Sequence, residues 1–362
     1  MRARVNQMLS RLSLRDFRCF RNLDIEFDPE ITCIVGQNAT GKTSLLEAVA
    51  VLIQLQSPRA SSLREAIRFG ARGLVVDGHV SGYHLQFYYG ATRRKLALDG
   101  VAQQMPDAYL DIYRAVYFGN SDIELVRGNA EARRRFLDFA GSQLFANYRE
   151  ILRSYQKALR SRNAFLKMVP TRPREVAAYA KPLLKFGHQL MALRAFLVER
   201  LEPGVVSAFS SVSDRGEAVT LKYQPGATND FENELAKSAG EEQRLKTTLI
   251  GPHRDDLQML VQGKPAELFA SEGQQRTIAI AVKLAQAQLL EARIGKPPIL
   301  LLDDVFGELD PGGRNRLMAN LPKRGQRLVT TTSFDWLSEI QHGRLGRLRA
   351  SEDGDRILEA VS

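Results

Sequence analysis

The sequence predicts an α/β fold: a P-loop nucleotide-binding lobe with a mixed sheet and helices, into which an α-helical arm lobe is inserted. Three observations predict this architecture. An apolar strand, a glycine loop and a helix follow one another in residues 31–55. Glycine then becomes rare and long helical periods appear from about residue 122. A second apolar strand, 298–304, ends in two carboxylates. We therefore expect three segments: 1–121, the N-terminal half of the lobe; 122–246, the helical arm; and 247–362, the C-terminal half.

Composition limits the class of protein. The chain has 362 residues, of which 44% are hydrophobic and 25% charged, an ordinary balance for a globular protein with a large core. No apolar run approaches the ~18 residues that a membrane span needs, and the N-terminus lacks a secretory apolar core. We therefore expect a cytoplasmic protein without a membrane partner. Cys19 and Cys33 form no metal-ligand pair, and a disulfide is not expected in such a chain.

The N-terminal half begins with β structure. Residues 9–28 alternate apolar and polar side chains, which predicts two strands joined around residues 17–22. After the glycine loop, residues 45–56 have helical spacing, and residues 57–70 are expected to form a loop and a second helix. Three alternating stretches separated by glycines predict an antiparallel meander over residues 73–100.

The glycine loop matches G-x-x-x-x-G-K-[ST] at every fixed position. Its glycines let backbone N–H groups surround a triphosphate, and the N-terminus of the following helix favours negative charge. Lys42 would neutralise the β- and γ-phosphates, and Thr43 would ligate Mg²⁺. A chance match is the alternative, but the flanking strand and helix favour a site for ATP and Mg²⁺. The expected nucleotide-binding residues of this loop are Gly36, Gln37, Asn38, Ala39, Thr40, Gly41, Lys42, Thr43 and Ser44.

The expected arm is strongly basic. Apolar residues recur every three or four positions over 143–168, and a second long helix is expected over about 175–202. Residues 127–200 contain sixteen basic and five acidic residues, which accounts for the whole net charge of +10. A concentrated basic helical region indicates a polyanionic partner, although a solvated helix face is the alternative.

Two carboxylates end the apolar strand at 298–304. Asp303 lies at the end of the strand, where a carboxylate holds Mg²⁺ in nucleotide-binding proteins. Asp304 follows directly, where a second carboxylate orients the water that attacks the γ-phosphate or takes a proton from it. An acidic cap between strand and loop is the alternative, but the glycine loop favours the catalytic interpretation. We expect Asp304 and Lys42 to be the catalytic residues, and Thr43 and Asp303 to be the metal ligands.

Two further stretches are ambiguous by themselves. Ser271 is a candidate N-cap for a long helix, and the stretch 271–276 would present a hydroxyl and a glycine amide to a phosphate. The stretch Glu308–Pro311 lies on a turn. Taken alone, the first indicates a capping loop and the second a charged turn before a helix.

His253 with the pair Asp255 and Asp256 suggests a metal site or a polar loop, and a single histidine favours the loop.

In sequence, the stretches 36–43, 271–276, 303–304 and 308–310 resemble the glycine loop, signature, Walker B strand and D-loop of ABC-type ATPases. The signature is S-E-G-Q, with Glu272 where most members have glycine. In that family the signature of one protomer completes the ATP site of another. The resemblance therefore implies that Ser271, Gly273 and Gln274 face ATP bound by a second copy, and that the chain forms a homodimer on binding ATP.

From end to end, the chain resembles the RecF family of bacterial recombination mediators. The most specific stretch after the glycine loop is G-P-H-R-D-D at residues 251–256, which is reproduced without substitution. The family's F-S-P-E-D segment differs, appearing as residues 118–122, and threonines at 330–332 stand where transporters have histidine. The other matching stretches are 14–18, 41–48, 57–59, 133–138 and 155–163.

This resemblance implies a function in DNA replication, DNA repair and the SOS response. It implies that Arg59 lies near the nucleotide, and that the protein binds double-stranded DNA and double-strand/single-strand junctions beside gaps. There it would help recombinase loading with RecO and RecR, with weak, DNA-dependent ATP hydrolysis driving release. The arm arginines should contact phosphates without reading bases. The alternatives are a nucleotide-gated DNA-binding scaffold with negligible hydrolysis, and an ABC transporter ATPase subunit, which the basic insert disfavours.

Overall fold

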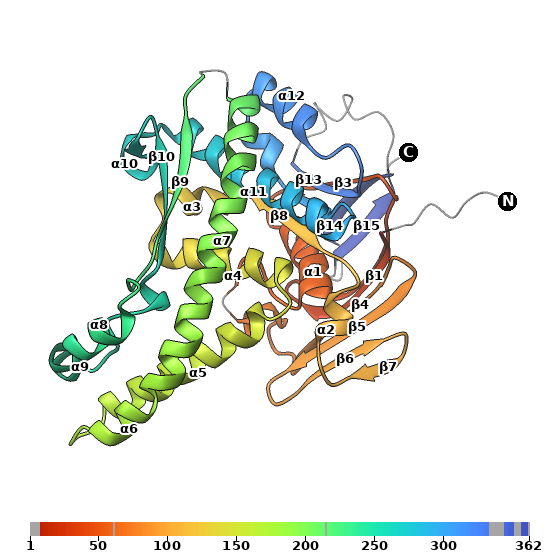
Figure 1. Cartoon of the computed structure of the whole chain (residues 1–362). Helices are drawn as coiled ribbons and strands as arrows, with labels where there is room; N and C mark the ends of the chain where they lie inside the picture. Colours follow the sequence, from red (N-terminus) through yellow and green to blue (C-terminus); the bar gives the residue numbers. More distant parts are fainter. Residues whose placement is uncertain (1–7, 61, 214–215, 333–343, 351–355, 361–362) are drawn as a thin grey trace. The chain divides into compact units, whose positions relative to one another are not determined.

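The computed structural model describes residues 8–60, 62–213, 216–332, 344–350 and 356–360 (Figure 1). The chain divides into two compact units. Unit 1 comprises residues 1–121 and 290–362, and unit 2 comprises residues 122–289. No helix within the described ranges is both long and apolar enough to cross a membrane.

Unit 1 contains an antiparallel sheet of six strands in the order β2-β1-β4-β5-β6-β7. Two of its tight hairpin turns, Ser81-Gly82 and Asp99-Gly100, have positive φ at both central residues, which matches the right-handed twist of the strands. The paired strands at 9–26 and the meander at 73–103 confirm the interpretation of the N-terminal half. The strands are β1 (Leu9–Phe17), β2 (Phe20–Glu26), β4 (Gly73–Val80), β5 (Tyr83–Gly90), β6 (Arg94–Leu98) and β7 (Val101–Gln103).

The second sheet of unit 1 is mixed, with the order β15-β14-β3-β13-β12-β8. Its strands are parallel from β14 to β8, and β15 pairs with β14 in the antiparallel sense. The last two strands therefore form an antiparallel hairpin, although residues 351–355 lie outside the described ranges. The strands are β3 (Ile31–Val35), β8 (Ala115–Gly119), β12 (Ile299–Asp303), β13 (Arg327–Thr331), β14 (Arg344–Ala350) and β15 (Arg356–Ala360).

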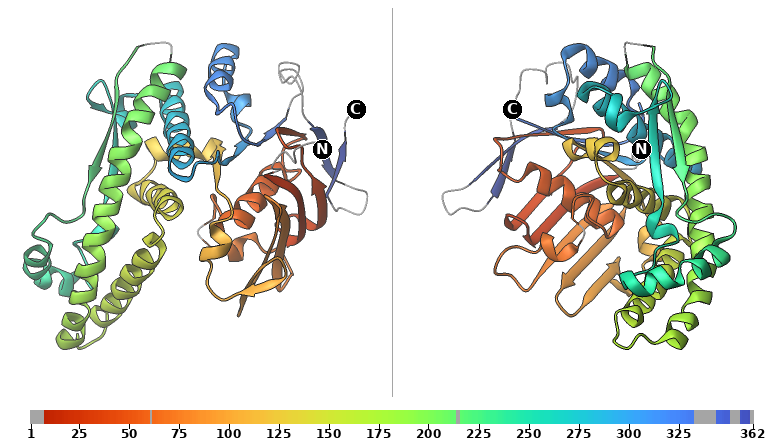
Figure 2. Two further views of the ribbon diagram at one scale, coloured as in Figure 1. Left: turned by 45° about the vertical axis from the view of Figure 1, so that its right-hand side comes forward. Right: turned by 90° about the vertical axis from the view of Figure 1, so that its left-hand side faces the viewer.

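Helix α1 (Lys42–Gln54) packs between the two sheets of unit 1 and contacts strands of both (Figure 2). Residues 45–54 of this helix are all buried, because apolar side chains cover its entire circumference. The mixed sheet is covered in the same way, and every residue of β3 and β12 is buried. The glycine loop between β3 and α1 is therefore mounted on a rigid core. Unit 1 also contains α2 (Asp107–Leu110), η4 (Val305–Glu308) and α12 (Pro311–Asn320).

The prediction of a second helix within 57–70 is wrong, because the described residues of this stretch form only the 3₁₀ turn η1 (Leu63–Ala66). Ser62 and Glu65 close a capping box at its start. The turn ends at once because Ile67 is extended and forms a bridge to Phe17 at the end of β1. Pairing with the sheet thus replaces further helix.

Unit 2 consists of helices around a three-stranded sheet in the order β11-β10-β9. Helices α5 and α7 lie side by side and antiparallel (Figures 1 and 2). The helices are α3 (Glu124–Arg127), α4 (Ala130–Leu144), α5 (Tyr148–Leu166), α6 (Pro173–Ala178), α7 (Ala180–Val212), α8 (Phe231–Lys237), α9 (Ala239–Leu245), α10 (Ala266–Phe269) and α11 (Glu272–Ile294). The strands are β9 (Val219–Gln224), β10 (Asp256–Val261) and β11 (Lys264–Pro265), and short 3₁₀ turns lie at Asn120–Ile123 (η2) and Pro252–Arg254 (η3).

Helix α7 extends ten residues beyond the expected end at residue 202. Pro203 lies inside it, but the apolar stripe continues through Val205, Phe209 and Val212, all of them buried. Gly204 allows a close approach to α11, because a Cβ there would lie 3.0 Å from Ala285 Cβ. Packing on both sides of the proline therefore outweighs its tendency to end a helix.

The division of the chain differs from the three expected segments in one respect. Residues 247–289, which we expected in the C-terminal half of the ATPase lobe, are grouped with the helical arm in unit 2. The physical reason is strand pairing: β10 pairs along its whole length with β9, the strand that follows α7. The start of the second unit, at residue 122, coincides with the expected start of the arm.

Candidate nucleotide site

The glycine loop connects β3 to α1, and two of its glycines are required by their surroundings. A Cβ at Gly36 would lie 2.6 Å from the carbonyl oxygen of Leu348, and one at Gly41 would lie 2.7 Å from Cys19 Sγ. Gly41 also has a φ of 108°, which side chains rarely tolerate. The loop backbone is consequently held tightly against β14 and the β1–β2 turn.

Lys42 is folded back over the loop. Its Nζ donates hydrogen bonds to the carbonyl oxygens of Gly36 (2.6 Å) and Gln37 (2.9 Å), and the residue is 7% exposed. Burial lowers the pKa of Lys42, whereas Asp304 and Asp303 act to raise it. The ammonium group is thus held by the loop and shielded from water. A positive charge in such a place attracts a phosphate group more strongly than one in bulk water.

Asp303, at the end of β12, accepts hydrogen bonds from three hydroxyl groups. Thr43 Oγ1 is 3.0 Å and Thr330 Oγ1 2.7 Å from Asp303 Oδ1. Tyr117 O–H is 2.6 Å from Oδ2. These residues come from α1, β13 and β8, and they meet because the parallel strands all end at the same edge of the sheet. The hydroxyl of Thr43 and the carboxylate of Asp303 are oxygen donors of the kind that Mg²⁺ takes beside a nucleotide.

Asp304 has an unusual backbone. Its φ of 54° lies in the left-handed region, which costs a residue other than glycine about 1–3 kcal/mol. Its N–H is directed at Thr330, 3.2 Å from the carbonyl oxygen and 3.1 Å from Oγ1. A side chain at Gly307 would crowd its carboxylate, since a Cβ there would lie 3.0 Å from Asp304 Oδ1. The strained turn therefore brings the carboxylate of Asp304 close to Gly307.

Arg59 is placed beside the first turns of α1 by a carboxylate that sequence reasoning missed. Glu47 is fully buried on α1 and accepts hydrogen bonds from Arg18 Nε (2.9 Å), Arg18 Nη2 (2.7 Å) and Ser57 Oγ (2.6 Å). Arg59 Nη1 lies 3.6 Å from the same carboxylate. An acidic residue within an otherwise apolar helix was the signal that could have identified this cluster.

The signature stretch lies in unit 2, at the start of α11. Ser271 Oγ accepts from the N–H of Gln274 (3.3 Å), and Gln274 Oε1 accepts from the N–H of Ser271 (2.6 Å). This reciprocal pair is a capping box, so the expected N-cap role of Ser271 is confirmed. Ser271, Glu272 and Gly273 are exposed, while Gln274 Nε2 also donates to Glu217.

The turn after β12 serves α12. Asp310 Oδ1 accepts from the N–H of Gly313 (2.7 Å), and Pro311 occupies the first helical position. The interpretation of this stretch as a charged turn before a helix therefore accounts for Asp310. The side chain of Glu308 lies outside the described part of the chain.

The G-P-H-R-D-D stretch forms a polar network inside unit 2. His253 Nε2 donates to the carbonyl oxygen of Thr248 (2.9 Å), so Nδ1 of the neutral ring accepts from Tyr155 O–H (2.6 Å). Burial lowers the pKa of His253 to about 4. Asp255 is fully buried and accepts from Arg194 Nη1 (2.7 Å). These bonds confirm the polar loop rather than a metal site.

Not all of the arm's positive charge faces solvent. Arg133, Arg162 and Arg194 are buried and pair with Asp256 (2.6 Å), Glu242 (2.6 Å) and the two acids Asp138 and Asp255 (2.7 Å each). The buried arginines stabilise unit 2. Among the described residues between 127 and 200, the exposed basic side chains are Arg127, Arg135, Arg153, Lys157, Arg160, Lys167, Arg172, Arg174, Lys181, Lys185 and Arg200.

The substituted segment at 118–122 joins the two units along the chain. Its last residue, Asp122, forms an ion pair with Lys283 of α11 (3.1 Å). Lys283 is 7% exposed and also lies over the ring of Phe136, 5.7 Å from its centroid. The aspartate of this segment is therefore attached to the helix that begins at the signature.

Sequence comparisons give relatives along nearly the whole chain. The model of the AAA domain family matches residues 11–107. The DNA replication and repair protein RecF of Synechococcus sp. strain JA-2-3B'a(2-13) is 37% identical over 96% of this chain and 99% of its own length. The protein of the same name from Symbiobacterium thermophilum is 35% identical over 94% of this chain and 96% of its own length.

Solved structures agree with the sequence comparisons. A structure of the recombination mediator protein RecF with ATP in the RecFOR pathway has a TM-score of 0.87 at 25% identity, covering 100% of this chain and 99% of that one. The corresponding structure with ATPrS has a TM-score of 0.85 at 26% identity, covering 99% and 100%. An Smc head bound to a winged-helix domain of ScpA, 15% identical with a TM-score of 0.57 and 98% coverage of each chain, shares the fold.

Proposed function

The chain belongs to the RecF family of DNA replication and repair proteins, and from this membership we propose that it is an ATP-dependent dimer that binds duplex DNA beside single-strand gaps. It is a RecF-type ATPase by family and fold. We further propose that it acts with RecO and RecR in recombinase loading, and that slow hydrolysis of ATP drives its release from DNA. One observation carries the proposal: Thr43 and Asp303, 260 positions apart, meet at 3.0 Å behind the glycine loop.

The nucleotide proposal assigns each residue of the loop a role. Residues 36–44 would surround the phosphates with backbone N–H groups, and Lys42 would exchange its bonds to loop carbonyls for phosphate oxygens. Mg²⁺, when bound, would neutralise charge between the phosphates, with Thr43 and Asp303 as its protein ligands. Thr330 and Tyr117 would hold the Asp303 carboxylate in one orientation through its two oxygen atoms. Arg59 would contribute a further positive charge beside α1.

Asp304 is our candidate for the residue that orients, or takes a proton from, the attacking water. The strained backbone of Asp304 supports this role, since strained backbone conformations cluster at active sites. Its neighbour Asp303 is oriented beside Thr43 by three hydroxyl groups, which suits the metal-ligand role and leaves the attacking water to Asp304.

The dimer proposal depends on the signature. Because the capping box binds the N–H of both Ser271 and Gln274 internally, the groups left at the start of α11 are the exposed residues Glu272 and Gly273 and the Ser271 hydroxyl. We propose that Ser271, Gly273 and Gln274 meet the γ-phosphate bound by a second copy, for which Gln274 Nε2 would exchange its bonds to Glu217. The 23-residue α11 would add the favourable dipole of its N-terminus.

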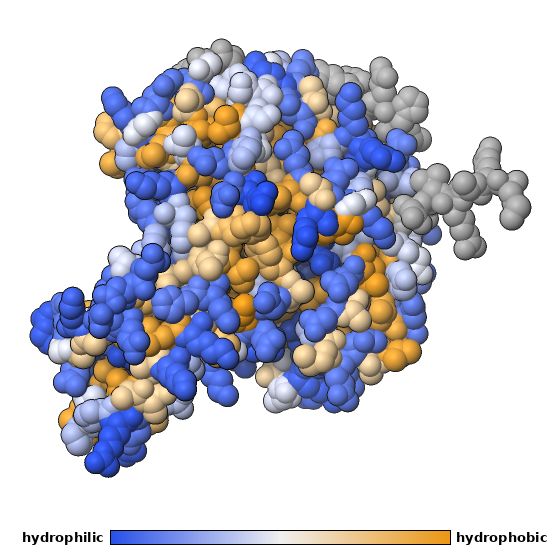
Figure 3. All heavy atoms as spheres, in the orientation of Figure 1, coloured by the Kyte–Doolittle hydropathy of each residue, from blue (hydrophilic) through white to orange (hydrophobic). Residues whose placement is uncertain are grey.

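The DNA proposal depends on the exposed basic residues of unit 2. Hydrophilic residues gather around α6 (Figure 3), where Arg172, Arg174 and Lys181 are exposed. Arginine and lysine on helices give phosphate contacts without base readout, so binding should weaken steeply with salt. Arg133, Arg162 and Arg194 are excluded from this role because their guanidinium groups are buried in ion pairs.

Steady-state ATP turnover, measured with and without a short duplex, tests this function. We expect slow turnover that rises when duplex is added at low salt. Tight ATP binding with no turnover in either condition would instead favour the nucleotide-gated scaffold. Turnover that ignores duplex at every salt concentration would contradict the DNA proposal.

A further inference from the structure

A cavity of about 650 Å³ lies in unit 1, on the side of the η1 turn and the β5–β6 hairpin. Its described lining residues include four arginines and no carboxylate. The arginines are Arg64, Arg68, Arg72 and Arg93, and we call this cavity the arginine pocket. Between residues 59 and 95 the chain has seven basic and two acidic residues, so the positive charge extends beyond the lining.

Little of this charge is neutralised within the protein. Arg68 Nε donates to Asp16 Oδ1 (2.9 Å), and Arg93 lies over the ring of Tyr88, 5.7 Å from its centroid. In the described part of the chain no carboxylate pairs with the guanidinium groups of Arg64, Arg72 or Arg93, and all three residues are exposed. A concave site with three uncompensated guanidinium groups suits phosphate, because their N–H groups match its oxygen atoms in pairs.

A phenylalanine adjoins this pocket along the chain, because Phe69 directly follows the lining residue Arg68. Phe69 is 100% exposed, in a turn where the N–H of Ala71 donates to the carbonyl oxygen of Arg68 (2.9 Å). Gly70, with a φ of 83°, supplies the left-handed residue that a type II turn requires. The turn is fixed to the end of β1, because the N–H of Arg68 donates to the carbonyl oxygen of Asp16 (2.9 Å). The aromatic ring is therefore held out in solvent by a bonded turn.

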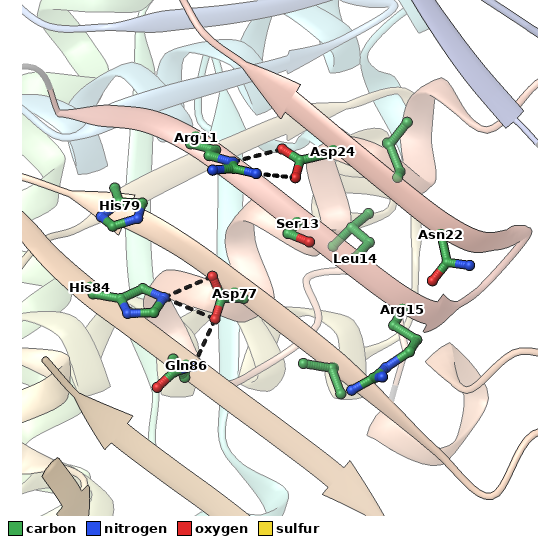
Figure 4. Close-up of a pocket in the computed structure, with 12 residues that line it drawn as sticks. Arg11, Ser13, Leu14, Arg15, Asn22, Asp24, Asp77, His79, His84 and Gln86 are labelled. Atoms are coloured by element: carbon green, nitrogen blue, oxygen red, sulfur yellow. Dashed lines mark hydrogen bonds and ion pairs between the residues drawn. The ribbon is translucent and has the colours of Figure 1, made fainter. Parts of the chain in front are cut away.

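A second hollow on the same sheet serves as a contrast. It measures about 820 Å³ and is also lined by charged side chains, but both of its carboxylates and most of its other charged groups form pairs with one another (Figure 4). Arg11 pairs with Asp24, while His84 and Gln86 both bond to Asp77. The paired hollow has no comparable excess of positive charge and no aromatic ring as exposed as Phe69, so the arginine pocket differs from an ordinary polar sheet face.

We propose that the arginine pocket and Phe69 form a binding site for single-stranded DNA. The arginines would hold backbone phosphates, and a base would stack on the ring of Phe69. A single strand fits better than a duplex because base faces are exposed only where the bases are unpaired. If the protein binds beside gaps as proposed above, the site would bind the single strand that leaves the duplex at the gap. Only this placement at a gap rests on the proposed function.

Fluorescence anisotropy with a short labelled oligothymidylate, without ATP, tests this site directly. We expect Phe69→Ala to weaken binding about five- to 150-fold, the range for removal of one stacked base. The double variant Arg64→Ala/Arg93→Ala should weaken it further and lower the salt slope by about 0.7 for each phosphate that is no longer neutralised. Phe69→Trp should retain binding and show quenched tryptophan fluorescence when the oligonucleotide is added.

Arg11→Ala is the matched control, because it removes an arginine of the same sheet that a carboxylate already neutralises. Its affinity should equal that of the unsubstituted protein. Equal affinity of Phe69→Ala and of the double arginine variant, with circular dichroism unchanged, would overturn the proposal. A duplex probe with Mg·ATP separates the two hypotheses: if duplex binding fails while oligothymidylate still binds through Phe69, the proposed function is wrong and the single-strand site stands.

Discussion

The nucleotide site of unit 1 and the basic helices of unit 2 differ in how closely residue type determines role. In the proposed site, most of the groups that would bind phosphate are backbone N–H groups of one contiguous loop, and side chains would only complete it. In unit 2, arginines of identical chemistry have opposite roles. Arg162 and Arg194 are buried and stabilise the fold, whereas Arg160 is exposed and available to a partner. A contiguous motif therefore predicts function more directly than a count of charges does.

The largest expected effect is on hydrolysis. Asp304→Asn should leave ATP binding and dimerisation intact and lower kcat about 10²- to 10⁴-fold, the usual worth of a positioned general base. Asparagine tolerates the left-handed backbone at this position, so the turn should be preserved. Single-turnover hydrolysis measures the effect. An unchanged rate would remove Asp304 from the catalytic residues, and failure to dimerise would contradict its separation from binding.

The next effect is on the stability of unit 2. Burial opposes the charge of Arg194, but Asp138, Tyr148 and Asp255 together raise its pKa well above the usual value. Arg194→Ala leaves Asp255 buried without its partner, which should lower the free energy of unfolding by about 3–5 kcal/mol. Urea unfolding followed by circular dichroism measures this change.

Arg160→Ala is the matched comparison for Arg194→Ala, since it removes the same side chain from an exposed position. It should leave the urea midpoint in place and lower the salt slope of duplex binding by about 0.9, the value for one neutralised phosphate. If Arg160→Ala destabilised the protein as much as Arg194→Ala, the division into buried and exposed arginines would fail.

A smaller effect is expected for Lys42→Ala. Removal of a charged hydrogen-bond donor to phosphate typically costs about 1.5–3 kcal/mol, which corresponds to roughly ten- to 150-fold in ATP affinity. Titration calorimetry measures it, with Lys323→Ala as a control for removal of an exposed lysine elsewhere in unit 1. Unchanged affinity would show that the loop backbone binds ATP without the ammonium group.

The last effect concerns pH. His253 has a pKa of about 4 in the folded protein, against an ordinary value of 6.5, because burial disfavours its charged form. Between these values the unfolded chain binds more protons, so stability present above about pH 6.5 should be lost as the pH falls towards 4. Urea midpoints across this range should fall for the unsubstituted protein and fall less for His253→Gln. Parallel pH profiles would contradict this assignment.

Much of the fold could be predicted because local patterns and core packing agree. Alternation over 9–28 and 73–100 and the apolar runs at 31–35 and 299–303 all became strands. The failures occurred where long-range contacts overrode local signals. Ile67 pairs with β1 and ends the expected helix at one turn, and packing carries α7 past Pro203 to residue 212. The pairing of β10 with β9 assigns residues 247–289 to unit 2, and no local pattern encodes that pairing.

The sequence predicted those parts of the candidate site that belong to recognisable motifs. The loop and Asp303 were identified, and the structure brings Thr43 to Asp303 at 3.0 Å. Tyr117, which binds the other oxygen of that carboxylate, lies in a strand with no motif, so only the folded sheet could identify it. The roles of Ser271, Gly273 and Gln274 stay predictions, because they concern a second copy of the chain.

The central claim is that two copies of this chain enclose ATP between the glycine loop of one and the signature helix of the other. Sedimentation velocity with Mg·ATP and a short duplex tests it most directly. We expect the protein to sediment as a monomer without nucleotide and as a dimer on DNA with it, and Lys42→Ala to stay monomeric. A protein that sediments as a monomer at saturating Mg·ATP and duplex would contradict the claim.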